Sequence, residues 1–200
     1  MKKFSLNLLL IFTVLSLMPI AVSISSIPYG GSSLEAADEE KKKKKRRRTK
    51  LPSKKAQRIL QALQPVIEAE QWDEAILMLA PIGAPDSKFT GTDRAKMYYY
   101  YGYIYFSQEK YSLAERAYND LMAEPDSNDQ ERLGALYSLS QLSYIREDYR
   151  GTIDYLDRWF ELEEYPSSDA YALLSTTYYQ IEDFQSSLKN IEIAINMQES

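Results

Sequence analysis

The chain of 200 residues contains no cysteine and no histidine. The missing cysteine excludes disulfides and thiolate nucleophiles, and the missing histidine excludes imidazole acid–base catalysis. Nearly all zinc sites need one of these two residue types, so a zinc centre is excluded as well. We therefore expect neither a metal nor any other cofactor.

Carboxylates remain as candidates for catalysis, but the sequence does not place them in a catalytic arrangement. Glu163 and Glu164 are adjacent, and adjacent side chains on a helix do not face each other. The segment DSNDQE at 126–131 lacks the glycine of a calcium-binding loop and fits a helix cap better. We expect a protein that is not an enzyme.

Charge is distributed very unevenly along the chain. The net charge is −5, yet residues 51–200 contain 13 basic and 25 acidic residues, a net charge of −12. The run KKKKKRRRTK at 41–50 precedes this acidic body. Blocks of this kind mark solvated or interacting segments, not packed structure.

The N-terminus has the features of an export signal. Two lysines precede an apolar run from Leu6 to Met18, and a small-residue segment ending at Ser23 follows Pro19. We interpret residues 1–23 as a secretory signal peptide. The alternative is an uncleaved anchor in the inner membrane that faces the periplasm, although the run is shorter than the roughly 20 residues of a spanning helix. No cysteine follows it, so a lipoprotein anchor is excluded.

Residues 24–53 are predicted to form a disordered linker that includes the basic run 41–50. They are rich in Ser, Gly and Pro at the start and show no apolar period. Behind an export signal, nucleic acid is not an expected partner for the basic run. It is a solvated tail, a weak contact, from Lys41 to Lys50, with anionic lipid headgroups or an acidic partner, or a segment that docks on the acidic body of the same chain.

The body of the chain, 54–200, repeats itself. Four aromatic residues, Trp72, Tyr111, Tyr149 and Phe184, each follow a short polar stretch at spacings of 39, 38 and 35 residues. A period of this length with helical patterning indicates a solenoid of helix–turn–helix units. The second unit reads Tyr98-x2-Tyr101-Gly102-x2-Tyr105, then Ala114-x3-Tyr118 and Pro125.

This pattern resembles the tetratricopeptide-repeat family over residues 55–198. The resemblance implies an all-α, right-handed superhelical solenoid of about four repeats, at 56–90, 95–127, 133–166 and 168–200. Members of the family are scaffolds that bind peptide segments in a groove. The segments RRRTKLPSKKAQ, LYSLSQLSYIREDYRGTIDYLDRWFE and AYALLSTTYYQIEDF further resemble periplasmic repeat proteins found with TonB–ExbB–ExbD energy-transduction systems. That similarity implies a periplasmic adaptor for TonB-dependent transport, with TonB, ExbB or ExbD as candidate partners.

In the family's geometry, one face of each first helix lines the groove. The corresponding positions of the last three units are predicted to bind a ligand, and they are Tyr99, Tyr103, Phe106, Tyr137, Gln141, Tyr144, Thr176 and Tyr179. None is charged, so the carboxylate-clamp role of some family members is not expected. An uncharged aromatic groove suits an extended or proline-rich segment. The alternative is that these rings only pack against a neighbouring helix.

The stretch MYYYYGYIYF at 97–106 taken alone favours a strand, because tyrosine and phenylalanine are common in strands. The repeat register predicts a helix instead. Its packing face is Tyr98, Tyr101, Gly102 and Tyr105, and its groove face is Tyr99, Tyr103 and Phe106. Tyr100 belongs to neither face.

The second helix of the fourth unit reaches Ser200, and no polar capping helix follows it. We expect its apolar face, with Ile191, Ala194 and Ile195, to be exposed, either because the sequence is a fragment or because this end associates with another chain, including a second copy. The alternative function to the adaptor is an oligomeric structural module, or a membrane-surface protein that acts through 41–50.

Overall fold

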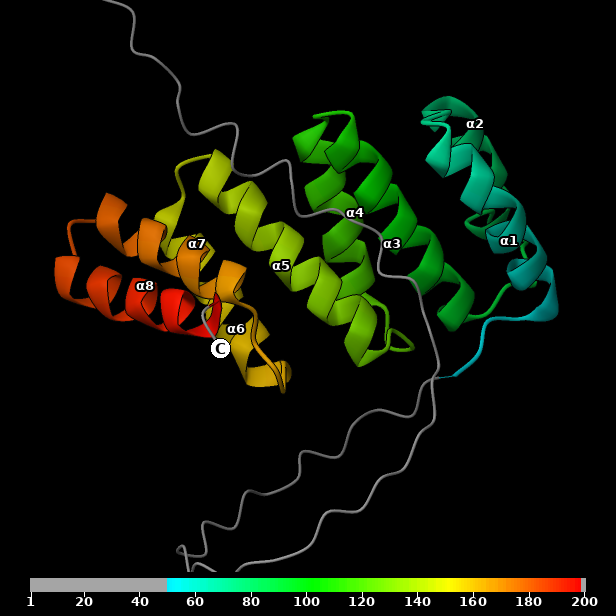
Figure 1. Cartoon of the computed structure of the whole chain (residues 1–200). Helices are drawn as coiled ribbons and strands as arrows, with labels where there is room; N and C mark the ends of the chain where they lie inside the picture. The colour runs from blue at the N-terminus through cyan, green and yellow to red at the C-terminus, as the bar shows by residue number, and fades with distance from the viewer. Residues whose placement is uncertain (1–49, 199–200) are drawn as a thin grey trace, which may run out of the picture. The chain divides into compact units, whose positions relative to one another are not determined.

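The computed structural model describes residues 50–198, and this part of the chain is helical with no strand. It contains eight α-helices and one short 3-10 helix (Figure 1). They are α1 (Lys54–Glu68), α2 (Trp72–Leu79), η1 (Ala80–Ile82), α3 (Gly91–Ser107), α4 (Tyr111–Ala123), α5 (Asp129–Ile145), α6 (Tyr149–Leu162), α7 (Ser168–Gln180) and α8 (Phe184–Gln198). The all-α prediction is confirmed for these residues. The predicted signal peptide 1–23, and the linker and basic run up to residue 49, lie outside the described residues.

The helices pack in consecutive pairs: α1 with α2, α3 with α4, α5 with α6, and α7 with α8. Each pair also contacts the next one along the chain, as α4 does with α5 and α6 with α7 (Figure 1). Contacts between neighbours in sequence are what a helical repeat requires. The stretch 97–106 lies within α3, so the helix prediction is confirmed and the strand reading is wrong.

One backbone turn joins the two helices of every pair. The residue after the C-cap of the first helix has a positive φ, between 54° and 63°, and in all four pairs it is a glutamate: Glu70, Glu109, Glu147 and Glu182. Its N–H donates to the carbonyl three residues earlier, and the next N–H donates to the carbonyl five residues earlier, at 2.9–3.1 Å. This pair of hydrogen bonds defines a Schellman motif. The aromatic residue that follows begins the second helix.

Within each pair, a small residue lets the two helices approach closely. A Cβ atom on Gly102 of α3 would lie 2.5 Å from Cε1 of Tyr118 on α4, so no side chain fits there. Across the pair α7–α8, the Ser175 hydroxyl donates to the Ser187 carbonyl at 2.8 Å. Small residues of the second helices, Ala75, Ala114 and Thr152, are fully buried.

The loops between pairs hold the first helices by capping boxes. Thr90 and Asp93 exchange hydrogen bonds at the start of α3, and Asn128 and Glu131 do so at the start of α5. The Asp93 carboxylate also accepts a hydrogen bond from the Ser53 N–H at 2.7 Å, which ties the entry of α1 to α3. Burial by itself raises the pKa of Asp93, but the hydrogen bonds from Thr90 and Ser53 outweigh it, so the pKa lies below its usual value.

The Gly102–Tyr118 contact generates a first prediction. Gly102→Ala is expected to lower the free energy of unfolding by roughly 1–2 kcal/mol, because overpacking costs about 1–3 kcal/mol and alanine regains up to about 1 kcal/mol of helix propensity. Tyr118→Leu in the same chain should recover part of this loss. In the third pair, Ser140 stands at the position of Gly102, and Leu156 stands at the position of Tyr118. Urea unfolding measures both. Gly83→Ala is the control, because its Cβ would meet only the flexible Met97 side chain; an equal loss there would contradict the explanation.

The repeated turn generates a second prediction. Glu109 has a φ of 58°, and a left-handed backbone costs a non-glycine residue about 1–2 kcal/mol. Glu109→Gly removes this cost but adds about 0.5–1 kcal/mol of backbone entropy in the unfolded chain. We expect a net stabilisation of up to about 1 kcal/mol in urea unfolding. Gln108→Gly, at a φ of −88°, should destabilise instead, and a gain in stability there would count against strain at Glu109.

Candidate functional site

The predicted groove residues lie on the first helices of three successive pairs: α3, α5 and α7. Six of their side chains are half-buried: Tyr99, Tyr103, Phe106, Tyr137, Gln141 and Tyr144. Thr176 and Tyr179 on α7 are exposed, and the Thr176 hydroxyl donates to the carbonyl of Ala172. We call the six aromatic members Tyr99, Tyr103, Phe106, Tyr137, Tyr144 and Tyr179 the aromatic row.

The α3 members of the aromatic row contact both neighbouring pairs. The Tyr103 ring meets Trp72 of α2 edge to face, with 6.2 Å between ring centroids. The Tyr99 ring lies against α5, because a Cβ on Gly134 would be 2.8 Å from Cε2 of Tyr99. Burial of Tyr99 raises the pKa of its hydroxyl. These two rings therefore serve as packing between pairs and leave only part of their surface accessible.

Three other members pack inside their own pairs, in the same way each time. Each contacts the ring that begins the second helix: Phe106 with Tyr111, Tyr144 with Tyr149, and Tyr179 with Phe184. The centroid distances are 6.0, 5.7 and 5.6 Å. These three residues therefore pack against a neighbouring helix, as the alternative to a binding role predicted. Tyr179 nevertheless remains 61% exposed.

Tyr137 of α5 lies beside Trp159 of α6, with 5.7 Å between ring centroids. Burial raises the pKa of Tyr137 to about 12, and the negative charge of Asp169 adds to this. Tyr100, which the sequence left between two faces, packs against the core of the first pair and edge to face on Tyr99.

Sequence reasoning missed two carboxylates near the aromatic row. Glu131 raises the pKa of Tyr99, and Asp169 raises that of Tyr137. Glu131 is 2% exposed, its Oε2 accepts a hydrogen bond from the Asn128 N–H, and Lys96 Nζ lies 2.9 Å from its Oε1. The capping-box sequence signalled Glu131 as a cap, but nothing signalled that it borders Tyr99, which lies 32 positions earlier.

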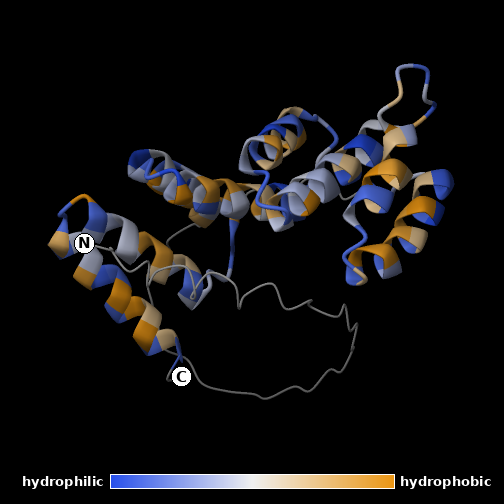
Figure 2. Cartoon of the chain, turned by 90° about the horizontal axis from the view of Figure 1, so that it is seen from above, coloured by the Kyte–Doolittle hydropathy of each residue, from blue (hydrophilic) through white to orange (hydrophobic). Residues whose placement is uncertain are grey.

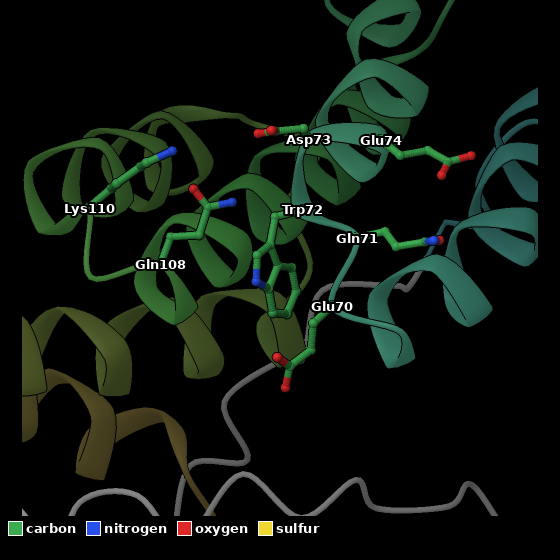
Figure 3. Close-up of a pocket in the computed structure, with 7 residues that line it drawn as sticks. All are labelled: Glu70, Gln71, Trp72, Asp73, Glu74, Gln108 and Lys110. Carbon is green, nitrogen blue, oxygen red and sulfur yellow. The ribbon is translucent and has the colours of Figure 1, made fainter.

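A surface hollow of about 450 Å³ lies between the turns of the first two pairs, beside Trp72, whose ring meets Tyr103 of the aromatic row. It is lined by Glu70, Gln71, Trp72, Asp73, Glu74, Gln108 and Lys110 (Figure 3). The Asp73 and Glu74 side chains point in opposite directions, so their carboxylates do not converge on one point (Figure 3).

Across residues 50–198, no three histidine, cysteine, aspartate or glutamate side chains gather as a metal site would need.

The raised pKa of Tyr137 makes stability depend on alkaline pH. In the unfolded chain a tyrosine ionises near about pH 10, whereas in the folded chain Tyr137 ionises at about 12. The unfolded state therefore loses its proton first, and the free energy of unfolding falls as the pH rises from 10 to 12. Tyr137→Phe keeps the ring and should reduce this fall by up to about 2 kcal/mol. Urea unfolding at pH 8, 10 and 11.5 tests it; Tyr165→Phe, at an 80% exposed position, is the control that should change nothing.

Comparison with known proteins adds no family assignment. No protein-family model matches the chain, and no curated protein matches it either. No helix among residues 50–198 is long and apolar enough to span a bilayer.

Proposed function

We propose that the chain is a non-enzymatic scaffold of the tetratricopeptide-repeat type that binds extended protein segments along the aromatic row. The observation that carries the proposal is that uncharged, partly accessible rings recur on the first helices of three successive pairs. The four matching turns and the small residues at the helix crossings support a tetratricopeptide arrangement, with the right-handed superhelix that this implies. The binding surface is then built by the same residues that join the repeats.

A proline-rich segment is the ligand that best suits this chemistry. A polyproline II helix has no internal hydrogen bonds, is already extended, and docks its rings and carbonyl groups on aromatic surfaces at low entropic cost. Tyrosine hydroxyls can donate to such carbonyls, because proline segments offer acceptors and few donors. The aromatic row has five tyrosines among its six rings, which matches that need.

The adaptor role in the cell is the broader part of the proposal. The similarity to periplasmic repeat proteins of TonB–ExbB–ExbD systems supports a place in the periplasm and a role in TonB-dependent transport. The partner would be an extended periplasmic segment of TonB or of its associated proteins. A groove without lysine or arginine favours such a segment over a partner recognised by a terminal carboxylate.

Binding can be tested by titrating the full chain with an uncharged proline-rich peptide and following intrinsic fluorescence. Tyr144→Ala and Tyr179→Ala are each expected to weaken binding five- to tenfold, since rings at binding surfaces commonly contribute more than about 1 kcal/mol. Tyr179→Phe, which retains the ring contact with Phe184, should bind nearly as the parent chain does.

The matched control is Tyr165→Ala. Tyr165 is 80% exposed and lies in the loop between α6 and α7, outside the aromatic row. Circular dichroism shows whether each variant keeps its helices. Equal affinity of Tyr165→Ala and Tyr179→Ala in folded chains, or no saturable binding by the parent chain, would refute the binding role of the aromatic row.

A further inference from the structure

The last helix carries an apolar stripe beside its contact with α7, and Phe184 at the start of the stripe touches Tyr179 of α7. Phe184, Leu188, Ile191 and Ile195 follow each other at spacings of four, three and four residues, which places them on one side of α8. Phe184 and Leu188 are each 59% exposed, and Ile195 is 48% exposed. Hydrophobic residues recur along α8, the helix that leads to the C mark in Figure 2. The sequence prediction of an exposed face is therefore right for Ile195, whereas Ile191 is half-buried and Ala194 is buried.

In the earlier pairs, we compare the residues that lie equally far from the start of the second helix. There, the next helix pair covers them. Ile191 corresponds to Tyr118 of α4 and to Leu156 of α6, and both of these are buried. Ile195 corresponds to Phe160 of α6, whose ring lies 4.8 Å from that of Tyr171 on α7. Two counterparts of the stripe thus pack against the next pair: Tyr118 shares a core cluster with residues of α5, and Phe160 contacts Tyr171 of α7.

Charge limits what can approach this stripe. The body from residue 51 onward has a net charge of −12, so two copies repel each other over most orientations. Helix α8 has one lysine, Lys189, and one glutamate, Glu192, and is the only helix of the eight between residues 50 and 198 with no net charge. Two copies that meet through α8 therefore bring no net helix charge together, although Glu182 and Asp183 lie just before Phe184.

Lys189 and Glu192 are also spaced to pair with each other across a two-fold axis. They lie three residues apart, on the same side of α8. Consider two α8 helices that lie antiparallel, with Leu188 of one copy against Ile191 of the other. Lys189 of each copy is then offset from Glu192 of the other by about 3 Å along the helix axis. The same symmetry brings Phe184 level with Ile195.

We propose that two copies of this chain associate through α8 in an antiparallel, two-fold symmetric pair, with the stripe Phe184–Leu188–Ile191–Ile195 as its core and Lys189 and Glu192 at its rim. Such an interface is self-complementary, because each contact occurs twice. The neighbouring exposed side chains Ile181 and Met197 extend the apolar area. The pair needs no ligand in the aromatic row. Because Phe184 of its core contacts Tyr179 of that row, the variant that separates the two proposals is Tyr144→Ala, whose ring packs on Tyr149.

Sedimentation equilibrium of the full chain over a range of concentrations tests the association. The parent chain should reach the mass of a dimer, and Leu188→Glu with Ile195→Glu should raise the dissociation constant at least a hundredfold. The matched control is Leu77→Glu with Leu113→Glu, two exposed leucines on α2 and α4, which should leave the dimer unchanged. The mass of a single chain at every concentration overturns the proposal, even if the α8 stripe then binds a different protein. A dimer that survives the α8 substitutions overturns it as well.

Two further experiments test the orientation. Lys189→Glu and Glu192→Lys should each weaken the dimer several-fold, whereas the double variant should restore it and an equimolar mixture of the single variants should form mixed dimers. Because the chain has no cysteine, Leu188→Cys mixed with Ile191→Cys should form a disulfide-linked dimer on mild oxidation. Efficient linking by Phe184→Cys alone, whose two copies would lie about 16 Å apart along the axis of the antiparallel pair, would show a parallel pair and overturn the antiparallel arrangement.

Discussion

The backbone turn that closes each first helix is the constraint on which the rest of the described chain depends. Two N–H groups donate back into the last turn of the helix and fix a left-handed residue, so the chain reverses through the same backbone turn four times. That reversal brings the second helix against the first, so closely at Gly102 that no side chain fits there. Stacking of the pairs then follows from the apolar faces that each pair leaves open.

The aromatic row is part of this same construction. Phe106, Tyr144 and Tyr179 each contact the ring that begins the second helix, so they stabilise the turn and at the same time form the exposed edge of the first helices. In the proposed binding role, a residue with both functions is held in one place before a ligand arrives, which would lower the entropic cost of binding. It also means that the rings cannot be removed without some cost in stability.

The sequence predicted the helices, their pairing period and the packing face that contains Gly102, because apolar spacing and small residues leave a direct mark on it. Three features left no mark. The left-handed turn residues are glutamates, and glutamate has no preference for a positive φ that would reveal them. The hydrogen bond from Ser53 to Asp93 joins residues 40 positions apart. The ring pairs of the aromatic row depend on side-chain directions that helical spacing alone does not determine.

The small residues at the helix crossings have a consequence for how such a chain changes over evolutionary time. Glycine opposite tyrosine, serine opposite leucine and leucine opposite leucine fill the same place in three of the pairs: Gly102–Tyr118, Ser140–Leu156 and Leu63–Leu79. Each pair balances its own volume, and the turn beside it is held by main-chain atoms. A pair can therefore exchange one combination for another on an unchanged backbone, but the next pair takes part in the exchange, because Tyr118 packs in one cluster with Ala135, Leu139 and Leu142 of α5.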